Sequence, residues 1–137
     1  MLHGLLVDAG PLIAILNRRD RHHDRCLAVL RGTDAPMLST WMAVTEAMYL
    51  LDFSMAAQDA LLEMIERGAL QILDIATTDL PEIKNLMKKY GDQPMEFADA
   101  SLVQVANRHG LDEIFTLDRR DFGVYRLKRG RHFKILP

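Results

Sequence analysis

The fold class is indicated first by the stretch Leu5-Leu6-Val7-Asp8-Ala9-Gly10-Pro11. In this stretch an aspartate directly follows a short apolar run. Three consecutive apolar residues are typical of a strand that is buried on both faces of a sheet. Pro11 suits the first turn of a helix, where its missing N–H is not needed, and the apolar pattern continues to Leu16. The stretch therefore predicts a buried strand that leads into a helix, with Asp8 between the two.

Helix-like and strand-like segments alternate along the rest of the chain. Helical periodicity or capping residues predict helices over residues 24–31, 41–53, 55–67, 80–90 and 96–109. Short apolar runs predict strands over residues 37–38, 70–75, 114–117 and 133–135. Because the two kinds of element alternate, we expect an α/β fold in three layers, with helices on both faces of a mainly parallel sheet. No linker or repeat divides the chain, so residues 1–137 are expected to form a single domain.

Composition indicates a soluble protein of a reducing compartment. Cys26 is the single cysteine, which excludes an internal disulfide. No apolar run has the length of a membrane span, and the N-terminus lacks the basic start and cleavage site of a signal peptide. We therefore expect a cytoplasmic protein without membrane contact.

Basic residues form two clusters although the net charge is −2. Residues 119–134 contain seven Lys or Arg and one acid, and residues 18–25 contain four Arg. Such clusters could hold a polyanion, although two solvated faces explain them equally well. The candidates for contact with a nucleic acid backbone are Arg18, Arg19, Arg119 and Arg120.

Two acids fall on apolar helix faces. Glu46 has Met42, Ala43, Tyr49 and Leu50 at helical spacing in a predicted helix with few polar residues, so we expect this helix to be buried and Glu46 to point inward. A buried carboxylate is costly without a partner, and the structural alternative to a functional role is an ion pair with an arginine.

Asp99 also begins an apolar stripe, with Leu102, Val103 and Ala106 following at helical spacing. An acid in the first turn of a helix is common because it favours the helix dipole. Glu96 lies nearer the start of this helix and would serve that purpose while facing solvent. Asp99 therefore needs another explanation.

Asp8 and Asp118 each follow a strand-like run, residues 5–7 and 114–117. In open α/β sheets, ligands bind beyond the carboxyl ends of the strands. Four ionised carboxylates in one place repel, with roughly 4 kcal/mol for a pair about 4 Å apart at an effective dielectric of 20. A divalent cation or raised pKa values would make the cluster tolerable, and oxygen ligands suit Mg²⁺ or Mn²⁺. The sequence contains no set of cysteine thiolates and no HExxH motif, so it does not indicate a zinc site.

Four segments together resemble the PIN-domain family, which includes VapC-type toxin ribonucleases. They extend in order from the first strand to Phe122: LLVDAGPLIAIL (5–16), WMAVTEAMYLL (41–51), FADASLVQVA (97–106) and IFTLDRRDF (114–122). The chain departs from many family members at Ala9 and Gly10, where hydroxyl or amide residues are common.

The resemblance implies a metal-dependent ribonuclease whose Mg²⁺ or Mn²⁺ activates water for in-line attack on an RNA phosphodiester. It places the four family acids, in order, on Asp8, Glu46, Asp99 and Asp118. It also implies a toxin held inactive by a small antitoxin, and a homodimer.

The resemblance assigns support of the site to two more residues near the fourth acid. Thr116 matches the hydroxyl residue two positions before the fourth acid and would position a ligand or water. Asp121 competes for the fourth place. We prefer Asp118, since it directly ends the predicted strand, and assign Asp121 to a helix cap or a supporting role.

Two other classes of protein compete with this interpretation. A phosphatase of the haloacid-dehalogenase type also places an aspartate after its first strand, but it needs a second aspartate two residues later, where Gly10 stands. A non-catalytic module that binds nucleic acid or protein would keep the basic clusters without needing all four acids.

Overall fold

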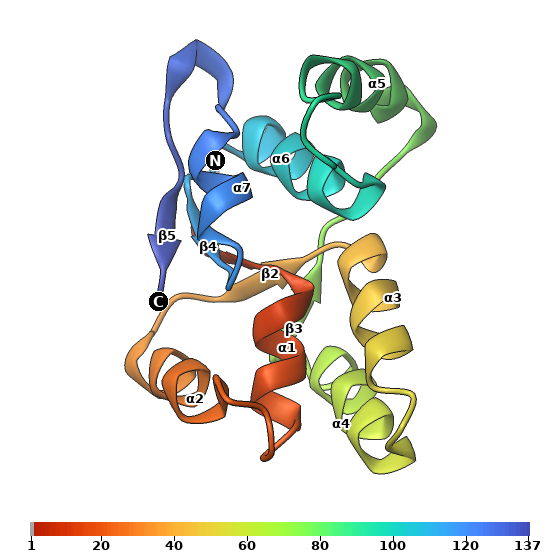
Figure 1. The fold of residues 1–137 in the computed structure, drawn as a ribbon, viewed down its shortest axis with the longest axis vertical. Coiled ribbons are helices and arrows are strands. Elements are labelled where there is room, and N and C mark those ends of the chain that lie inside the picture. Colours follow the sequence, from red (N-terminus) through yellow and green to blue (C-terminus); the bar gives the residue numbers. More distant parts are fainter. Residues whose placement is uncertain (1) are drawn as a thin grey trace.

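The computed structural model describes residues 2–137 and contains a five-stranded sheet at its centre (Figure 1). All strand pairs are parallel, and the strand order is β3-β2-β1-β4-β5. The predicted three-layer α/β/α fold is thus confirmed, with a sheet that is parallel throughout. The strands are β1 (Leu5–Val7), β2 (Met37–Ser39), β3 (Leu70–Ile72), β4 (Glu113–Phe115) and β5 (Lys134–Leu136).

Helices cover both faces of the sheet, with α1 to α4 mainly on one side and α5 to α7 on the other (Figure 1). No helix within residues 2–137 is long and apolar enough to cross a membrane. The helices are α1 (Ala9–Leu16), α2 (His23–Gly32), α3 (Trp41–Leu50), α4 (Met55–Glu66), α5 (Leu80–Lys89), α6 (Phe97–His109) and α7 (Arg119–Val124). Two short 3₁₀ turns, η1 (Thr77–Asp79) and η2 (Lys128–Gly130), complete the elements.

The apolar run of β1 serves both layers, because successive side chains of a strand point to opposite faces. Leu6 packs with residues of α5, α6 and α7, whereas Leu5 and Val7 pack with residues of α1 to α4. All three side chains are at most 1% exposed. This double burial explains why the run contains no polar residue, and it fixes Asp8 at the end of the central strand.

Two predicted strands are shorter in the structure. The strand expected over residues 70–75 ends at Ile72, and the one expected over 114–117 ends at Phe115. After Phe115 the chain turns, and the Thr116 hydroxyl accepts the N–H of Asp118 at 3.0 Å. Asp118 therefore does not directly end a strand.

Asp118 caps helix α7, which the sequence did not predict as an element, by accepting the N–H of Asp121 at 3.0 Å. The proposed cap role of Asp121 was wrong for a geometric reason. An N-cap side chain bonds an N–H two or three residues further on, and α7 begins at Arg119.

Helix α3 is less buried than predicted. It ends at Leu50, and residues 51–53 form a turn. Trp41 is 50% exposed, Tyr49 74% and Phe53 64%. Only the side of α3 with Ala43, Val44 and Ala47 is buried. Helix α3 packs against α1 and α6.

Candidate active site

A pocket of about 450 Å³ opens beyond the carboxyl ends of β1 and β4. Strand β1 has β2 as its neighbour on one side and β4 on the other, so the strand order reverses direction at β1. The pocket therefore lies at a topological switch point of the sheet, where α/β proteins bind ligands. The walls come from α1, α3, α6, α7 and the loops beside them. They are formed by Asp8, Ala9, Gly10, Ile13, Glu46, Leu50, Pro94, Glu96, Asp99, Leu117, Asp118 and Asp121.

Asp8 is the most deeply buried acid of the pocket, with 8% exposed. Its Oδ1 atom accepts the N–H of Ala9 at 2.8 Å, which caps α1, and its Oδ2 atom accepts the Thr116 hydroxyl at 2.8 Å. Burial raises the pKa of this carboxyl, and the two hydrogen bonds oppose that shift. Asp8 is thus held rigidly in an environment that disfavours its charge.

Thr116 is fully buried and links two of the predicted acids. Its hydroxyl donates to Asp8 and accepts the N–H of Asp118. The loop that leaves β4 is therefore fixed against the end of β1. Thr116 contacts a predicted metal ligand directly, as expected of a group that orients it.

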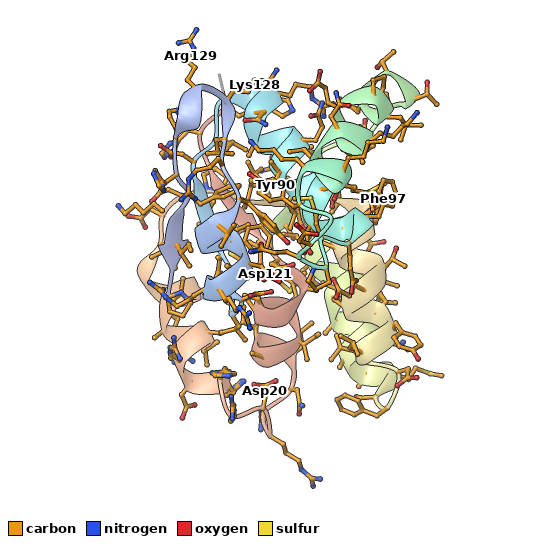
Figure 2. All side chains as sticks on the ribbon, turned by 45° about the horizontal axis from the view of Figure 1, so that its top comes forward. Asp20, Tyr90, Phe97, Asp121, Lys128 and Arg129 are labelled. Carbon is orange, nitrogen blue, oxygen red and sulfur yellow. The ribbon has the colours of Figure 1, made fainter. Side chains whose placement is uncertain are left out.

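Asp118 and Asp121 both line the pocket, and Asp121 on α7 lies above the N-terminal part of α1 in Figure 2. Burial and the neighbouring Asp118 raise the pKa of Asp121. Asp118 was preferred as the fourth acid because it was expected to end a strand directly, but the strand ends earlier in the structure. Both carboxyls remain candidates by position.

Glu46 lies half-buried on the pocket side of α3. Residues 2–137 contain three ion pairs, and none of them includes Glu46, so the alternative of a core salt bridge is wrong. Burial raises the pKa of Glu46, and repulsion from Asp8 and Glu96 adds to this. Its inward direction agrees with the helical spacing, although the helix as a whole is more exposed than expected.

Asp99 stands opposite, in the first turn of α6. Burial raises its pKa to about 7, the N–H of Glu96 opposes this, and the charges of Asp8, Glu46 and Glu96 raise it further. The repulsion places acids from three separate segments of the chain, at the starts of α1 and α6 and on α3, within electrostatic reach of one another.

Glu96 was not predicted as a pocket residue. Glu96 is the N-cap of α6, as its position near the helix start suggested, but it lines the pocket instead of serving only as a solvent-facing acid. Its N–H donates to Asp99 Oδ2 at 3.2 Å. The three-residue spacing to Asp99, which puts both on one side of the first turn, was the available signal.

The predicted contact residues for nucleic acid lie outside the pocket. Arg18, Arg19, Arg119 and Arg120 are exposed, and none of them lines it. The Arg119 guanidinium donates to the carbonyl of Pro137. Arg119 and Arg120 directly follow Asp118 in the chain, so they lie near the rim.

The donor set of the pocket fits a hard divalent cation. Its titratable lining groups are all carboxyls, and no Lys or Arg among residues 2–137 lines it to balance their charge. Oxygen donors of this kind are those of Mg²⁺ and Mn²⁺ sites. The raised pKa values of Asp8, Glu46 and Asp99 reflect burial and repulsion that a cation would relieve.

The four predicted acids line the same pocket, but their carboxyl groups do not converge around one position. Within residues 2–137, no three His, Cys, Asp or Glu side chains lie close enough together to enclose a metal ion. The expectation of four carboxylates gathered tightly around one ion is therefore not met in this arrangement. An open set of ligands suits Mg²⁺, which keeps several waters and takes few protein oxygens.

The chain belongs to the PIN-domain family, whose model matches residues 5–128. It is 25% identical over 135 residues to Ribonuclease VapC26 of Mycobacterium tuberculosis, a match that covers 97% of this chain and 100% of that protein. The resemblance found in the four sequence segments is thus confirmed.

Solved structures of the same fold include a toxin and a toxin–antitoxin complex. The chain matches Mycobacterium tuberculosis VapC20, described as a toxin that cleaves the sarcin-ricin loop, with a TM-score of 0.75 and 14% identity over 81% of this chain and 87% of that one. A toxin–antitoxin complex from Klebsiella pneumoniae gives a TM-score of 0.69 and 18% identity, covering 98% and 97%. At these identities, the likeness establishes the fold.

Proposed function

We propose that this PIN-domain protein is an endoribonuclease that cleaves RNA phosphodiester bonds with Mg²⁺ or Mn²⁺, and that it is the toxin of a toxin–antitoxin pair. The observation that supports this most is the pocket at the sheet's switch point, whose titratable lining groups are all acids. Family membership and the likeness to a named ribonuclease support the same activity.

In this proposal Asp8, Glu46, Asp99 and Asp118 share the cation, some of them as direct ligands and the others through water that the ion keeps. The ion, when bound, lowers the pKa of water and offsets the charge that develops on the phosphoryl group. Thr116 keeps the Asp8 carboxylate in place through its 2.8 Å hydrogen bond.

The other side chains at the pocket have separate tasks. Asp121 and Glu96 line the pocket as well, and in this proposal one of them would accept a proton from the attacking water. Arg18, Arg19, Arg119 and Arg120 bind the RNA backbone outside the acidic pocket, which makes affinity fall with salt.

The two rival classes explain less. PIN-family membership sets aside the haloacid-dehalogenase phosphatase. A non-catalytic module on this fold gives no reason for Asp8, Glu46 and Asp99 to share a pocket in which their pKa values are raised. Cleavage explains that arrangement, since perturbed carboxyls are common where a metal or catalysis needs them.

A protein partner is part of the proposal. Large apolar side chains of α3, α4 and the turn between them are exposed, with Tyr49 at 74%, Phe53 at 64% and Met55 at 83%. Adjacent exposed apolar groups of this size are typical of interaction surfaces. The Klebsiella pneumoniae neighbour is a toxin–antitoxin complex. We propose a small antitoxin as the partner and a homodimer as the assembly.

The test is cleavage of a mixed RNA pool, with cut sites mapped by sequencing. Wild type should cut with Mg²⁺ or Mn²⁺ and stop when a chelator is added, and Asp8→Asn should lose at least about a hundredfold in rate while folding normally. Full activity of Asp8→Asn, or cutting that ignores the chelator, would overturn the assignment. Adding the product of a neighbouring small reading frame to the same assay tests the antitoxin, which should abolish cutting.

A further inference from the structure

The ring of Tyr125 is fixed inside the layer formed by α5, α6 and α7, and its side chain is fully buried. It packs edge-to-face on Tyr90, with 5.0 Å between ring centroids, and on Phe122, with 5.1 Å. Figure 2 labels Tyr90 in the middle of this layer. Two aromatic contacts of this kind leave the Tyr125 ring little freedom to turn its hydroxyl elsewhere.

The Tyr125 hydroxyl faces a carboxylate of the proposed site. It donates to Asp99 Oδ2 at 3.4 Å, the one side-chain hydrogen bond of this hydroxyl within residues 2–137. A buried phenol needs a partner, because an unpaired hydroxyl has lost the hydrogen bonds that water supplies in the unfolded chain. The contact therefore satisfies Tyr125 and orients Asp99 together.

The two carboxyl oxygens of Asp99 differ in the hydrogen bonds that they accept. Oδ2 accepts both the Tyr125 hydroxyl and the N–H of Glu96 at 3.2 Å, whereas Oδ1 accepts no hydrogen bond within residues 2–137. Asp99 lines the pocket, and a carboxylate held at one oxygen by two donors keeps its other oxygen free for a further ligand. Hydrogen bonds of this kind commonly orient a carboxylate that ligates a metal.

We propose that Tyr125 is a positioning residue that holds Oδ2 of Asp99, so that Oδ1 is the oxygen offered to the divalent cation. The inference rests on the proposed metal site. It gives Tyr125 a role parallel to that of Thr116, whose hydroxyl holds Oδ2 of Asp8. The segment from Thr116 to Tyr125 then orients two carboxylates from distant parts of the chain, in addition to providing Asp118.

The test compares Tyr125→Phe with Tyr90→Phe. Each variant removes one hydroxyl from the same buried aromatic group, but the Tyr90 hydroxyl accepts the N–H of Arg126 at 2.9 Å and contacts no pocket acid. Calorimetry measures the dissociation constant for Mn²⁺, and thermal unfolding in chelator measures stability. Tyr125→Phe should weaken Mn²⁺ binding about tenfold, while Tyr90→Phe should leave binding unchanged even where it lowers the melting temperature.

RNA cleavage gives a second measurement on the same variants. Saturating Mn²⁺ should restore most of the kcat of Tyr125→Phe and leave its KM for RNA unchanged, because the defect lies in cation binding. Mn²⁺ binding by Tyr125→Phe equal to wild type, or equal losses in both variants, would overturn the role of Tyr125.

Failure of the proposed function has a different signature. Wild type that binds Mn²⁺ but cuts no RNA contradicts the ribonuclease and leaves the comparison of the two variants valid. Wild type that binds no Mn²⁺ overturns the metal site and the role of Tyr125 together. If Tyr125→Phe does not fold, a crystal structure of wild type with Mn²⁺ tests the role of Tyr125. In that structure Oδ1 of Asp99 should face the ion and Oδ2 should face Tyr125, and the reverse arrangement would overturn the role.

Discussion

Asp99 shows how a single carboxyl can be costly to the fold. It is partly buried among Asp8, Glu46 and Glu96, and burial is the main reason why its pKa rises to about 7. The unfolded chain ionises the same group near pH 3.9. Between these values the folded state holds a proton that the unfolded state has lost, so stability falls as pH rises.

The predicted consequence is that Asp99→Asn stabilises the metal-free protein at neutral pH. Asparagine keeps an oxygen to accept the bonds from Glu96 and Tyr125 but carries no charge to repel Asp8 and Glu46. Urea unfolding in chelator should show the variant more stable than wild type at pH 8. The difference should shrink as pH falls through 7 and vanish near pH 4. A difference that is constant from pH 4 to 8 would rule out the charge of Asp99 as the cause.

At the scale of elements, the 3₁₀ turn η1 is tied to α6 by a buried acid that lies outside the pocket. Asp79 accepts the Gln104 amide at 2.8 Å, the Ala76 N–H at 2.8 Å and the Arg108 guanidinium at 2.6 Å. Burial alone would raise its pKa, but these three donors lower it below the ordinary value. The connection places α5 against α6 and so supports the helix that carries Asp99.

Asp79→Asn should therefore cost about 1–3 kcal/mol in the free energy of unfolding at pH 7, since it sets an amide N–H against groups that are all donors. Arg67→Gln, which breaks the exposed pair of Arg67 with Glu63, is the control and should cost less than about 1 kcal/mol. Because the Asp79 pKa is lowered, its contribution is present above pH 4 and disappears as pH falls through the folded value. Equal costs in both variants at pH 7 would contradict this account.

The elements that sequence patterns predicted are those with strong local signals. The strand before Asp8 and the helix that starts at Leu80 were confirmed, because an apolar run and an early proline specify them. Helix α7 was missed, since it has only six residues and shows no apolar periodicity. Its start depends on the bond from Asp118 to the Asp121 N–H, which no spacing rule selects over its neighbours.

The site was only partly predictable for a related reason. Glu46 and Asp99 could be found because each lies on an apolar helix face, where an acid is unusual. Asp8 could be found because it directly follows a buried strand. Glu96 stands at a helix start, where acids are ordinary. Tyr125 is 26 residues from Asp99 in sequence, so only tertiary packing of α7 on α6 brings its hydroxyl to that carboxylate.

At the scale of the whole molecule, topology concentrates the negative charge while the basic segments lie apart. The parallel sheet brings the ends of β1 and β4 to one edge, and the helices that follow add the remaining acids. Lys128 and Arg129 project at the opposite end of the molecule from Asp20, which lies within the first basic cluster (Figure 2). If the proposed function holds, a long RNA contacts both ends only by crossing the molecule, with the pocket between them.

Diffraction from crystals soaked in Mn²⁺ shows whether the acidic pocket binds a divalent cation. The anomalous signal of manganese should give a peak inside the pocket, in contact with oxygens of Asp8 and Asp99, and Asp8→Asn crystals should lose that peak. A pocket without a peak at saturating Mn²⁺, with the metal bound elsewhere or nowhere, would contradict the account.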